Sequence, residues 1–392
     1  VRVIAITSLI SGVYIGMLNT VLQPFTLSIG LGLTALGILQ ALGNRFSGIT
    51  ASLIQPFTGH YADVFGRKVV IVVGSAATIG SMILFLIAAL TQSWVVLTTA
   101  YLLYGISMLS SPASQAVVAE SVSLEPTKMH VAFSSVFLFA SIPGAVMSFV
   151  AGVLADSVGY FVVFVIAVIL ESVALFIFMR ELRETKAPGR TLESIVSRDR
   201  FSLRSAMSLP KGFLGFFATF AMDSFTFGIS ATIIYGMLVD RFRYSNTEIG
   251  LIVGTLAIAT ILAQYPATRL LIRVGPKKSL ALSEFFGCVL MLGWWLSDSI
   301  PLFVLLSVVF GISIATWVPA QQSMLMAHSP SGERGSLAGK LAAFRGLVSF
   351  PAPIVGGLLY QTFGYDAPLL ASAAGILLTF AMIVRLLPNG AR

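Results

Sequence analysis

Long apolar runs recur from one end of this 392-residue sequence to the other, and they decide what the chain can fold into. The hydrocarbon core of a bilayer is about 30 Å thick, so a helix that crosses it needs about 20 mostly apolar residues. Hydrophobic residues make up 57% of the chain and charged residues only 10%, against roughly 25% charged in an ordinary soluble domain. A surface this poor in charge excludes a soluble enzyme, a nucleic-acid-binding protein and a disordered chain.

The apolar runs predict an all-α, polytopic membrane protein with twelve spanning helices. Strands of a membrane barrel are shorter, about 10 residues, and they alternate polar with apolar residues, which these runs do not. The predicted spans cover residues 3–29, 33–58, 69–91, 94–119, 128–156, 159–180, 211–238, 247–272, 278–298, 300–327, 334–362 and 366–387. The first run is longer than the roughly 7–15 residues of a signal-peptide core, so no cleavable signal is expected.

One long polar stretch divides the spans into two sets of six. We expect an N-terminal six-helix bundle over residues 1–180, a cytoplasmic loop over 181–210 and a C-terminal six-helix bundle over 211–392. Within the loop, apolar residues spaced among charges favour a surface helix over 191–205.

The two sets of spans repeat one another in sequence. Gly105-Ile106-Ser107 in the fourth span recurs as Gly311-Ile312-Ser313 in the tenth, and Gln115 matches Gln321 at the same offset. Two parallel six-helix repeats, related by an axis along the membrane normal, form a known transporter architecture.

The basic residues predict the orientation of the chain. Of the 24 lysines and arginines, only Arg241 and Arg243 fall in loops that follow odd-numbered spans, and Arg45 and Arg345 lie inside spans. Because cytoplasmic loops carry an excess of lysine and arginine, both termini and the central loop are expected in the cytoplasm, with the protein in the plasma (cytoplasmic) membrane. The net charge of +8 then reflects topology and does not indicate a nucleic-acid partner.

The loop between the second and third predicted spans carries a motif. Gly59, Asp63, Gly66, Arg67 and Lys68 follow the order Gly, three residues, Asp, two residues, Gly and two basic residues. Together with the twelve spans and the repeat, this loop resembles the signature loop of the major facilitator superfamily, and the resemblance covers essentially the whole chain. It implies a secondary transporter that works by alternating access, with the loop as a latch that stabilises the outward-open state. A plain positive-inside loop is the alternative.

The sequence departs from the superfamily pattern in places. The counterpart loop in the second half keeps Gly275 and Lys277 but has Ile272 at the aspartate position. An arginine expected in the fourth span is Tyr101, and the fifth-span Gly-Pro motif of antiporters is missing at Met147-Ser148. These departures disfavour a drug–proton antiporter.

Charged residues inside spans are costly and usually functional. Arg45, Asp223 and Arg345 lie about 17–21 Å from the cytoplasmic ends of their spans at a helix rise of 1.5 Å per residue. The resemblance implies that these spans are neighbours, so we expect one acid and two bases to meet at a central cavity. Asp223 would carry a coupling proton, and the arginines would balance its charge or bind a substrate carboxylate. A structural ion pair that joins the two halves is the alternative.

Two further carboxyls lie within spans. Glu171, in the sixth span, is expected to be protonated and hydrogen-bonded to a neighbouring helix, because burial disfavours the charged form. Glu284 is nearer the cytoplasmic end and is expected to reach the interface or to pair with a lysine.

Polar and aromatic residues on spans one, four, seven and ten are expected to line the cavity by analogy with the family, with ordinary packing as the alternative for each. They are Asn19, Gln23, Tyr101, Tyr104, Gln115, Phe227, Trp317 and Gln321.

The leading hypothesis is a proton-coupled secondary transporter of a small organic solute, with an anion as one option. A multidrug efflux proton antiporter is the alternative, favoured by 29 phenylalanines and 13 methionines. A membrane enzyme or a channel is less favoured, because no histidine or carboxylate cluster gathers at one membrane face.

No cofactor and no metal site are expected, since the three histidines have no metal-ligand spacing. The expected partners are the solute, protons or another coupling ion, and lipid, and we expect a monomer. Substrate identity and transport direction stay open.

Overall fold

The fold is that of a computed structural model. It describes residues 2–45, 48–121, 126–182, 184, 213–328 and 334–388. These residues form α-helices and one short 3-10 helix, with no strand in the described ranges. The surface helix expected over 191–205 lies outside the described residues.

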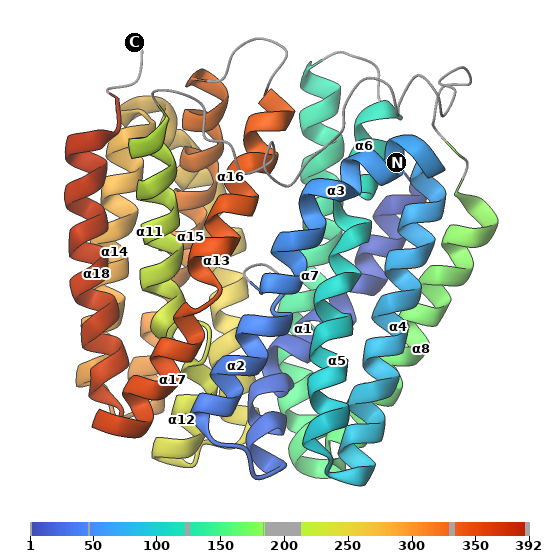
Figure 1. Cartoon of the computed structure of the whole chain (residues 1–392), viewed down its shortest axis with the longest axis horizontal. Coiled ribbons are helices and arrows are strands. Elements are labelled where there is room, and N and C mark those ends of the chain that lie inside the picture. Colours follow the sequence, from blue (N-terminus) through green and yellow to red (C-terminus); the bar gives the residue numbers. More distant parts are fainter. Residues whose placement is uncertain are drawn as a thin grey trace.

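The N-terminal half contributes eight α-helices and the 3-10 helix to the described ranges, packed side by side (Figure 1). They are α1 (Arg2–Ser28), α2 (Leu33–Gly43), α3 (Ile49–Phe65), α4 (Arg67–Thr91), α5 (Trp94–Ile106), η1 (Ser107–Leu109), α6 (Ser110–Glu120), α7 (Pro126–Val158) and α8 (Tyr160–Glu181).

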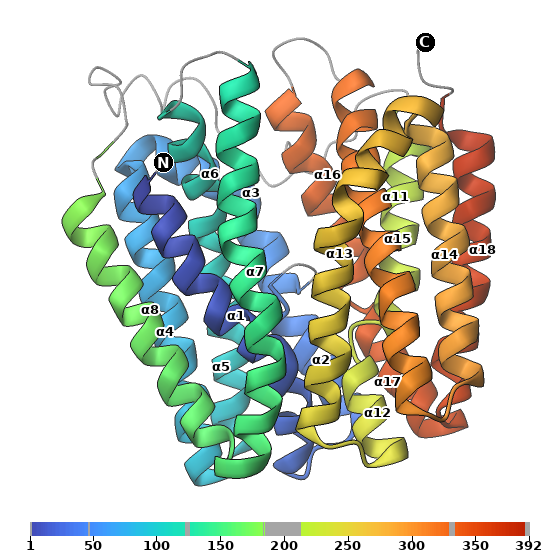
Figure 2. The same cartoon turned by 180° about the vertical axis from the view of Figure 1, so that it is seen from behind.

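The described helices of the C-terminal half form the second side of the molecule (Figure 2). They are α11 (Leu214–Ser230), α12 (Ile234–Phe242), α13 (Asn246–Val274), α14 (Pro276–Leu296), α15 (Ile300–His328), α16 (Arg334–Ser349), α17 (Ala352–Phe363) and α18 (Asp366–Leu386). The beginning of α1 and the end of α18 lie at the same end of the molecule (Figure 1).

Eleven helical segments of the described ranges are long and apolar enough to cross a membrane. The second expected span, residues 33–58, is the exception, because it divides into α2 and α3. Gly43 and Gly48 flank the break, and glycine is a poor helix former. The all-α polytopic fold is therefore confirmed. The fourth, seventh and eleventh expected spans also consist of more than one helix, but each still forms one continuous apolar segment long enough to cross a membrane.

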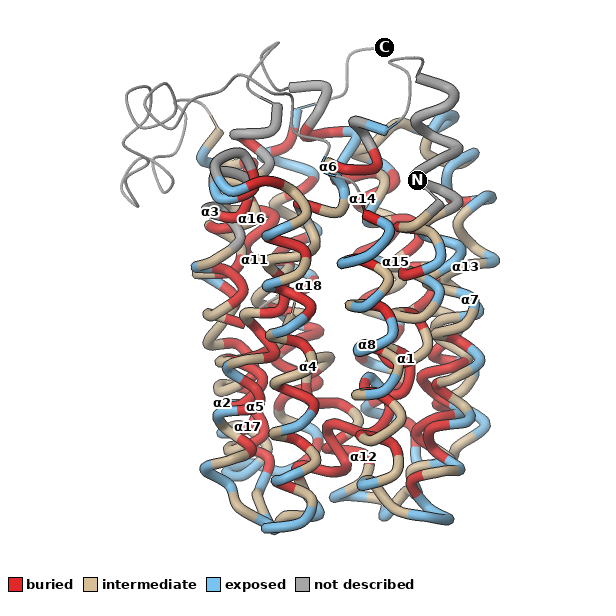
Figure 3. The backbone as a smooth tube through the Cα atoms, turned by 90° about the vertical axis from the view of Figure 1, so that its right-hand side faces the viewer, coloured by how far each residue is buried: buried red, intermediate tan, exposed pale blue. Residues whose placement is uncertain are grey.

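Burial follows the membrane environment. Large apolar side chains lie exposed on outer helix faces, for example Phe139, Leu262 and Phe363, where lipid would cover them. Figure 3 shows buried residues mainly between helices and exposed ones mainly on the outside. Each half has its own buried core, around Phe85 and Phe164 in the first and around Trp294 and Phe303 in the second.

Glycine brings helices into backbone contact in each half. A Cβ atom on Gly16 of α1 would collide with the carbonyl oxygen of Gly144 on α7. In the second half, a Cβ on Gly356 of α17 would collide with the carbonyl oxygen of Ile229 on α11. Small residues are the usual way for membrane helices to approach closely.

Candidate functional site

Three charged side chains of the C-terminal half gather between α11, α14 and α16. Asp223 on α11 is 6% exposed, and Glu284 on α14 is 1% exposed. Arg345 on α16 interacts electrostatically with Asp223, while its Nε donates a hydrogen bond to Ser224 Oγ at 2.8 Å. We name Asp223, Glu284 and Arg345 the carboxyl-pair cluster.

Glu284 gives this cluster a second acid. Neither of its carboxylate oxygens has a hydrogen-bond partner among the described residues, and its carboxyl interacts electrostatically with that of Asp223. Two ionised carboxylates repel and have no proton to donate, so a bond between them forms only when one is protonated. The expectation that Glu284 reaches the interface or a lysine is wrong, because its side chain is buried against α11.

The sequence held a signal for Glu284. It lies nine residues after Gly275, which begins α14, so it is about 14 Å along the helix, a depth similar to that of the other charged residues. Its position in an otherwise apolar helix is the feature that sequence reasoning undervalued.

Arg45 lies in the N-terminal half, at the break between α2 and α3. Its guanidinium carbon is 5.2 Å from the centroid of the Tyr104 ring, a cation–π distance, and the group also interacts electrostatically with Tyr14 and Glu171. The described contacts of Arg45 therefore run to α1, α5 and α8 of its own half. The three residues expected in one cluster are therefore divided between the two halves. The cluster that contains Asp223 has two acids and one base, whereas the sequence predicts one acid and two bases.

Glu171 is the buried acid of the N-terminal half. It lies on α8, is 3% exposed, and its Oε1 accepts a hydrogen bond from the hydroxyl of Ser75 on α4. Its Oε2 has no hydrogen-bond partner among the described residues, and the same holds for Nε of Arg45. Glu171 thus has the hydrogen bond to a neighbouring helix that the sequence predicts.

Arg45 and Glu171 line the same cavity, which has a volume of about 220 Å³ and lies inside the N-terminal half. Nine of its lining residues carry hydroxyl groups, among them Tyr14 and Ser75, and Gln115 lines it too. We name this space the N-half cavity. Both of its charged side chains present an unpartnered polar atom.

The other candidate cavity residues of the N-terminal half are placed differently. Gln23 joins the halves: its Nε2 donates to the Thr232 carbonyl at 3.0 Å, and its Oε1 accepts from the Gly236 amide at 2.9 Å. Tyr101 is buried, with its hydroxyl 3.1 Å from that of Thr26. Asn19 is exposed on α1.

In the C-terminal half, the two aromatic candidates pack against other rings. Phe227 stacks on Phe310 with 6.3 Å between ring centroids, and Trp317 meets Phe220 edge-on at 5.6 Å. Gln321 is buried at 5% exposure.

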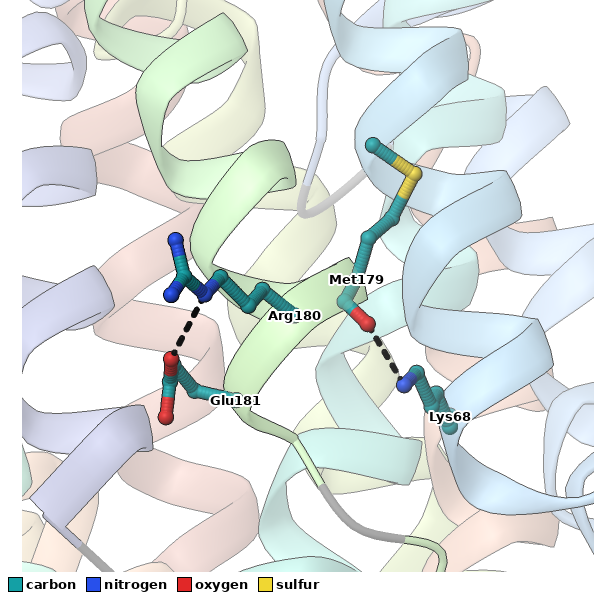
Figure 4. A network of polar contacts seen from close by, with 4 residues as sticks. All are labelled: Lys68, Met179, Arg180 and Glu181. Carbon is teal, nitrogen blue, oxygen red and sulfur yellow. Dashed lines mark hydrogen bonds and ion pairs between the residues drawn. The ribbon is translucent and has the colours of Figure 1, made fainter.

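The signature loop turns at Gly66, whose φ of 99° favours glycine. The carboxylate of Glu184 accepts hydrogen bonds from the backbone amides of Arg67, at 3.0 Å, and Lys68, at 3.1 Å. Lys68 Nζ donates to the carbonyl of Met179 at 2.7 Å, near the end of α8 (Figure 4). The loop is therefore tied to the last helix of its own half.

The described residues do not cover the whole of the expected latch. Gly59 and Asp63 lie on α3, and the side-chain surroundings of Asp63 are outside the described residues. Sequence reasoning missed the role of Glu184. The available signal is an acid just after α8, since the amides that begin a helix attract carboxylates.

The second-half loop keeps the same backbone device. Gly275 has a φ of 82° and begins α14, and Lys277 Nζ donates to the Leu387 carbonyl at 2.8 Å, just after α18. Like Lys68, Lys277 lies two residues after its glycine. The loss of the aspartate at Ile272 has therefore left the glycine turn and the lysine contact in place.

At the end of the molecule away from the termini, Asp156 of α7 caps the beginning of α13 across the two halves. Its Oδ1 accepts from the amide and side chain of Asn246, at 3.1 and 2.7 Å. Its Oδ2 accepts from the amide and hydroxyl of Thr247, at 2.7 and 2.6 Å. A carboxylate at a helix N-terminus is favourable because it meets unpaired amides and the positive end of the helix dipole.

The sequence model of the Major Facilitator Superfamily matches residues 4–233 and 212–392. The MFS-type transporter SLC18B1 of Homo sapiens is 30% identical over 152 residues, 37% of this chain and 33% of that protein. The match thus spans about a third of that relative's length. The multidrug resistance protein MdtG of Escherichia coli (strain 55989 / EAEC) is 24% identical over 352 residues, 88% of this chain and 84% of that protein. The crystal structure of the nucleoside transporter NupG aligns with a TM-score of 0.74 at 14% identity, covering 99% of each chain.

Proposed function

The chain belongs to the Major Facilitator Superfamily, and on this premise we propose that it is a proton-coupled secondary transporter of a small organic solute. The observation that carries the proposal is the carboxyl-pair cluster, in which two buried carboxyls interact electrostatically beside one arginine. Such a pair holds one proton more readily than none, because two adjacent buried negative charges repel. It is a group that can take up and release a proton.

The coupling step uses the position of Arg345. With its Nε on Ser224 and its charge near Asp223, the guanidinium favours the ionised form of that carboxyl. A movement of α16 relative to α11 changes the distance between the two charges. The cluster then binds a proton when the arginine is distant and releases it when the arginine is near.

Alternating access fits the contacts between the halves. Asp156 caps α13, and Thr34 of α2 donates to Gln361 of α17 at 2.6 Å, both at the end away from the termini. If the termini are cytoplasmic, this end faces outward and is closed, which is an inward-facing arrangement.

The test of coupling uses purified protein in liposomes with an imposed pH gradient. A thermal-shift screen at two pH values first identifies a stabilising solute, because a ligand that binds the folded state stabilises it by mass action. We expect this solute to dissipate the gradient with the wild-type protein and not with Asp223→Asn, which should still bind it. Gradient dissipation by Asp223→Asn at the wild-type rate would show that the cluster is structural.

Multidrug efflux is the second candidate. The observation that favours it is the similarity to a protein named for multidrug resistance along 88% of this chain. Cells that express the protein should then accumulate less ethidium than cells that express Asp223→Asn. Equal accumulation in the two strains, together with a stabilising ligand among small polar solutes in the thermal-shift screen, would favour a transporter specific for a small solute over a multidrug exporter.

We further propose that both termini and the 181–210 loop are cytoplasmic and that the protein lies in the plasma membrane. The support is the distribution of lysine and arginine in the sequence. In a Cys288→Ser background, Arg190→Cys should react with a membrane-impermeant maleimide only after the cytoplasmic side is opened. Labelling of intact cells would overturn this orientation.

A further inference from the structure

We propose that the N-half cavity is a binding site for a small zwitterionic solute, one that carries a carboxylate and an ammonium group. The inference adds a site to the proposed transporter, at a place remote in the fold from the carboxyl-pair cluster. Its basis is that two oppositely charged side chains line one cavity, and each has a buried polar atom without a partner among the described residues.

Buried polar atoms without partners are unusual. More than about nine in ten buried polar groups in proteins are hydrogen-bonded, and an unsatisfied charged group costs more than a neutral one. Here two such atoms, Arg45 Nε and Glu171 Oε2, open onto the same cavity. One is a donor that carries positive charge and the other an acceptor on a carboxyl group, so one ligand with both charges would satisfy both.

Each charged group is held by a neighbouring side chain, and the two groups also interact electrostatically with each other. Tyr104 lies against the guanidinium of Arg45, with 5.2 Å to its ring centroid, and Ser75 donates to Oε1 of Glu171. Among the described residues, these contacts leave the second carboxylate oxygen and the guanidinium Nε without a hydrogen-bond partner, so that each can meet a ligand. Arginine suits a carboxylate because its planar, permanently charged group can donate two parallel hydrogen bonds.

Size and lining point to a small polar molecule. Pockets for drug-sized ligands are about 300–1,000 Å³ and mostly apolar. The N-half cavity, at about 220 Å³, is smaller, and nine residues with hydroxyl groups and Gln115 are among its 17 lining residues. Its volume equals that of about seven water molecules at roughly 30 Å³ each. Hydroxyl groups both donate and accept, so they can serve either end of a zwitterion.

The test is equilibrium binding to the purified full-length protein, measured by calorimetry. The probes are L-alanine, β-alanine and 4-aminobutyrate, which place the two charges at increasing separation, with butyrate and butylamine as single-charge controls. We expect one of the zwitterions to bind at least tenfold more tightly than either control. Failure of all three zwitterions to bind, or equal binding of butyrate or butylamine, would overturn the proposal.

Variants connect binding to the two side chains. Glu171→Gln keeps the side-chain size, and Arg45→Gln replaces the guanidinium by a shorter neutral amide. Each should weaken zwitterion binding at least tenfold. Arg45→Lys, which keeps the charge but loses Nε, should weaken it by an intermediate factor. Ser172→Ala changes the exposed neighbour of Glu171 on α8 and is the matched control, with wild-type binding expected. Gel filtration and thermal unfolding would show that each variant is folded.

Wild-type affinity in folded Glu171→Gln or Arg45→Lys protein would place the ligand elsewhere and refute the site. Because the readout is binding at equilibrium, its result does not depend on proton coupling. The pH-gradient experiment with Asp223→Asn tests that proposal separately, so either one can fail alone.

Discussion

The two halves of the molecule share a backbone framework but place their buried charges differently. In each half, a glycine turn begins the third span, and the lysine two residues later donates a hydrogen bond to a backbone carbonyl near the end of the last helix. Glycine also brings the first and fifth spans of each half into backbone contact. The charges diverge. The first half keeps an acid and a base around a cavity, and the second half brings two acids and a base together.

One position shows the divergence directly. Ser75 lies nine residues after Gly66, and Glu284 lies nine residues after Gly275, at the same place on the third helix of each half. In the first half this serine donates to an acid on α8. In the second half the acid stands at the position itself and faces α11. A repeat can therefore keep its packing while each copy acquires its own chemistry.

The comparison separates two roles of buried charge. The carboxyl-pair cluster has groups whose protonation depends on one another, which suits proton movement. The N-half cavity has groups of opposite sign, each with a polar atom that has no hydrogen-bond partner among the described residues, which suits a ligand. The following predictions test this division and the shared framework, from the largest expected effect to the smallest.

Loss of Arg345 should have the largest effect on stability. Arg345→Ala leaves Asp223 without its base, and breaking a buried charge pair costs about 3 kcal/mol or more of unfolding free energy. The double variant Arg345→Ala/Asp223→Asn should regain about half of this loss, because it no longer strands a charge. Denaturant unfolding followed by tryptophan fluorescence measures both. A double variant as unstable as the single one would mean that Arg345 acts through packing alone.

The shared framework should respond equally in both halves. Gly16→Ala and Gly356→Ala each place a methyl group against a carbonyl oxygen, and such overpacking costs about 1–3 kcal/mol. Gly339→Ala on α16 is the control, since nothing lies near its Cβ position and alanine favours a helix. The same unfolding assay applies. A loss confined to one half would show that the two helix contacts are not equivalent.

The fold was largely predictable from the sequence because membrane spanning depends on local composition. A run of about 20 apolar residues predicts a spanning helix without any knowledge of the helices that pack against it. The break at Gly43 and Gly48 escaped prediction because the segment stays apolar on both sides of it. A Cβ on Gly43 would collide with the carbonyl oxygen of Tyr101, so the glycine at the break also permits a close approach of α2 to α5 that the sequence does not reveal.

The candidate sites were less predictable, because contacts between helices depend on rotation as well as depth. Arg45, Asp223 and Arg345 have similar depths, but depth does not tell which side of its helix each occupies. The structure keeps Arg345 near Asp223 and directs Arg45 to Tyr104 and Glu171. Glu184 and Asp156 were missed because each caps a helix that is distant in sequence.

The contact between the halves at Asp156 should have an intermediate effect. Asp156→Asn has one accepting oxygen in place of two, so it loses up to two of the four hydrogen bonds to Asn246 and Thr247, a change of about 1–2 kcal/mol. This corresponds to a shift of roughly tenfold toward separation of the two halves at this end.

Spin labels can measure that shift. In a Cys288→Ser background, labels at Ser157 on α7 and Leu251 on α13 should show a larger population of long distances in Asp156→Asn. Asp240→Asn is the matched control, because Asp240 accepts from Tyr360 within the C-terminal half at 2.6 Å. An unchanged distribution in Asp156→Asn, or the same change in the control, would contradict a specific clamp between the halves.

The smallest effect is expected at the paired lysines. Lys68→Met and Lys277→Met each remove one hydrogen bond to a carbonyl at the end of their half, which is worth about 1 kcal/mol or less. Global unfolding would barely register such a change, but hydrogen–deuterium exchange reports local opening at the beginning of α4 and of α14. We expect faster exchange at the altered loop and no change at its counterpart. Arg180→Gln removes an exposed ion pair with Glu181 and should leave both loops unchanged, because surface pairs contribute little. If only one lysine variant shows faster exchange, the two loops share their geometry, but the lysine hydrogen bond stabilises only one of them. The two halves would then differ in this part of the backbone framework as well as in their buried charges.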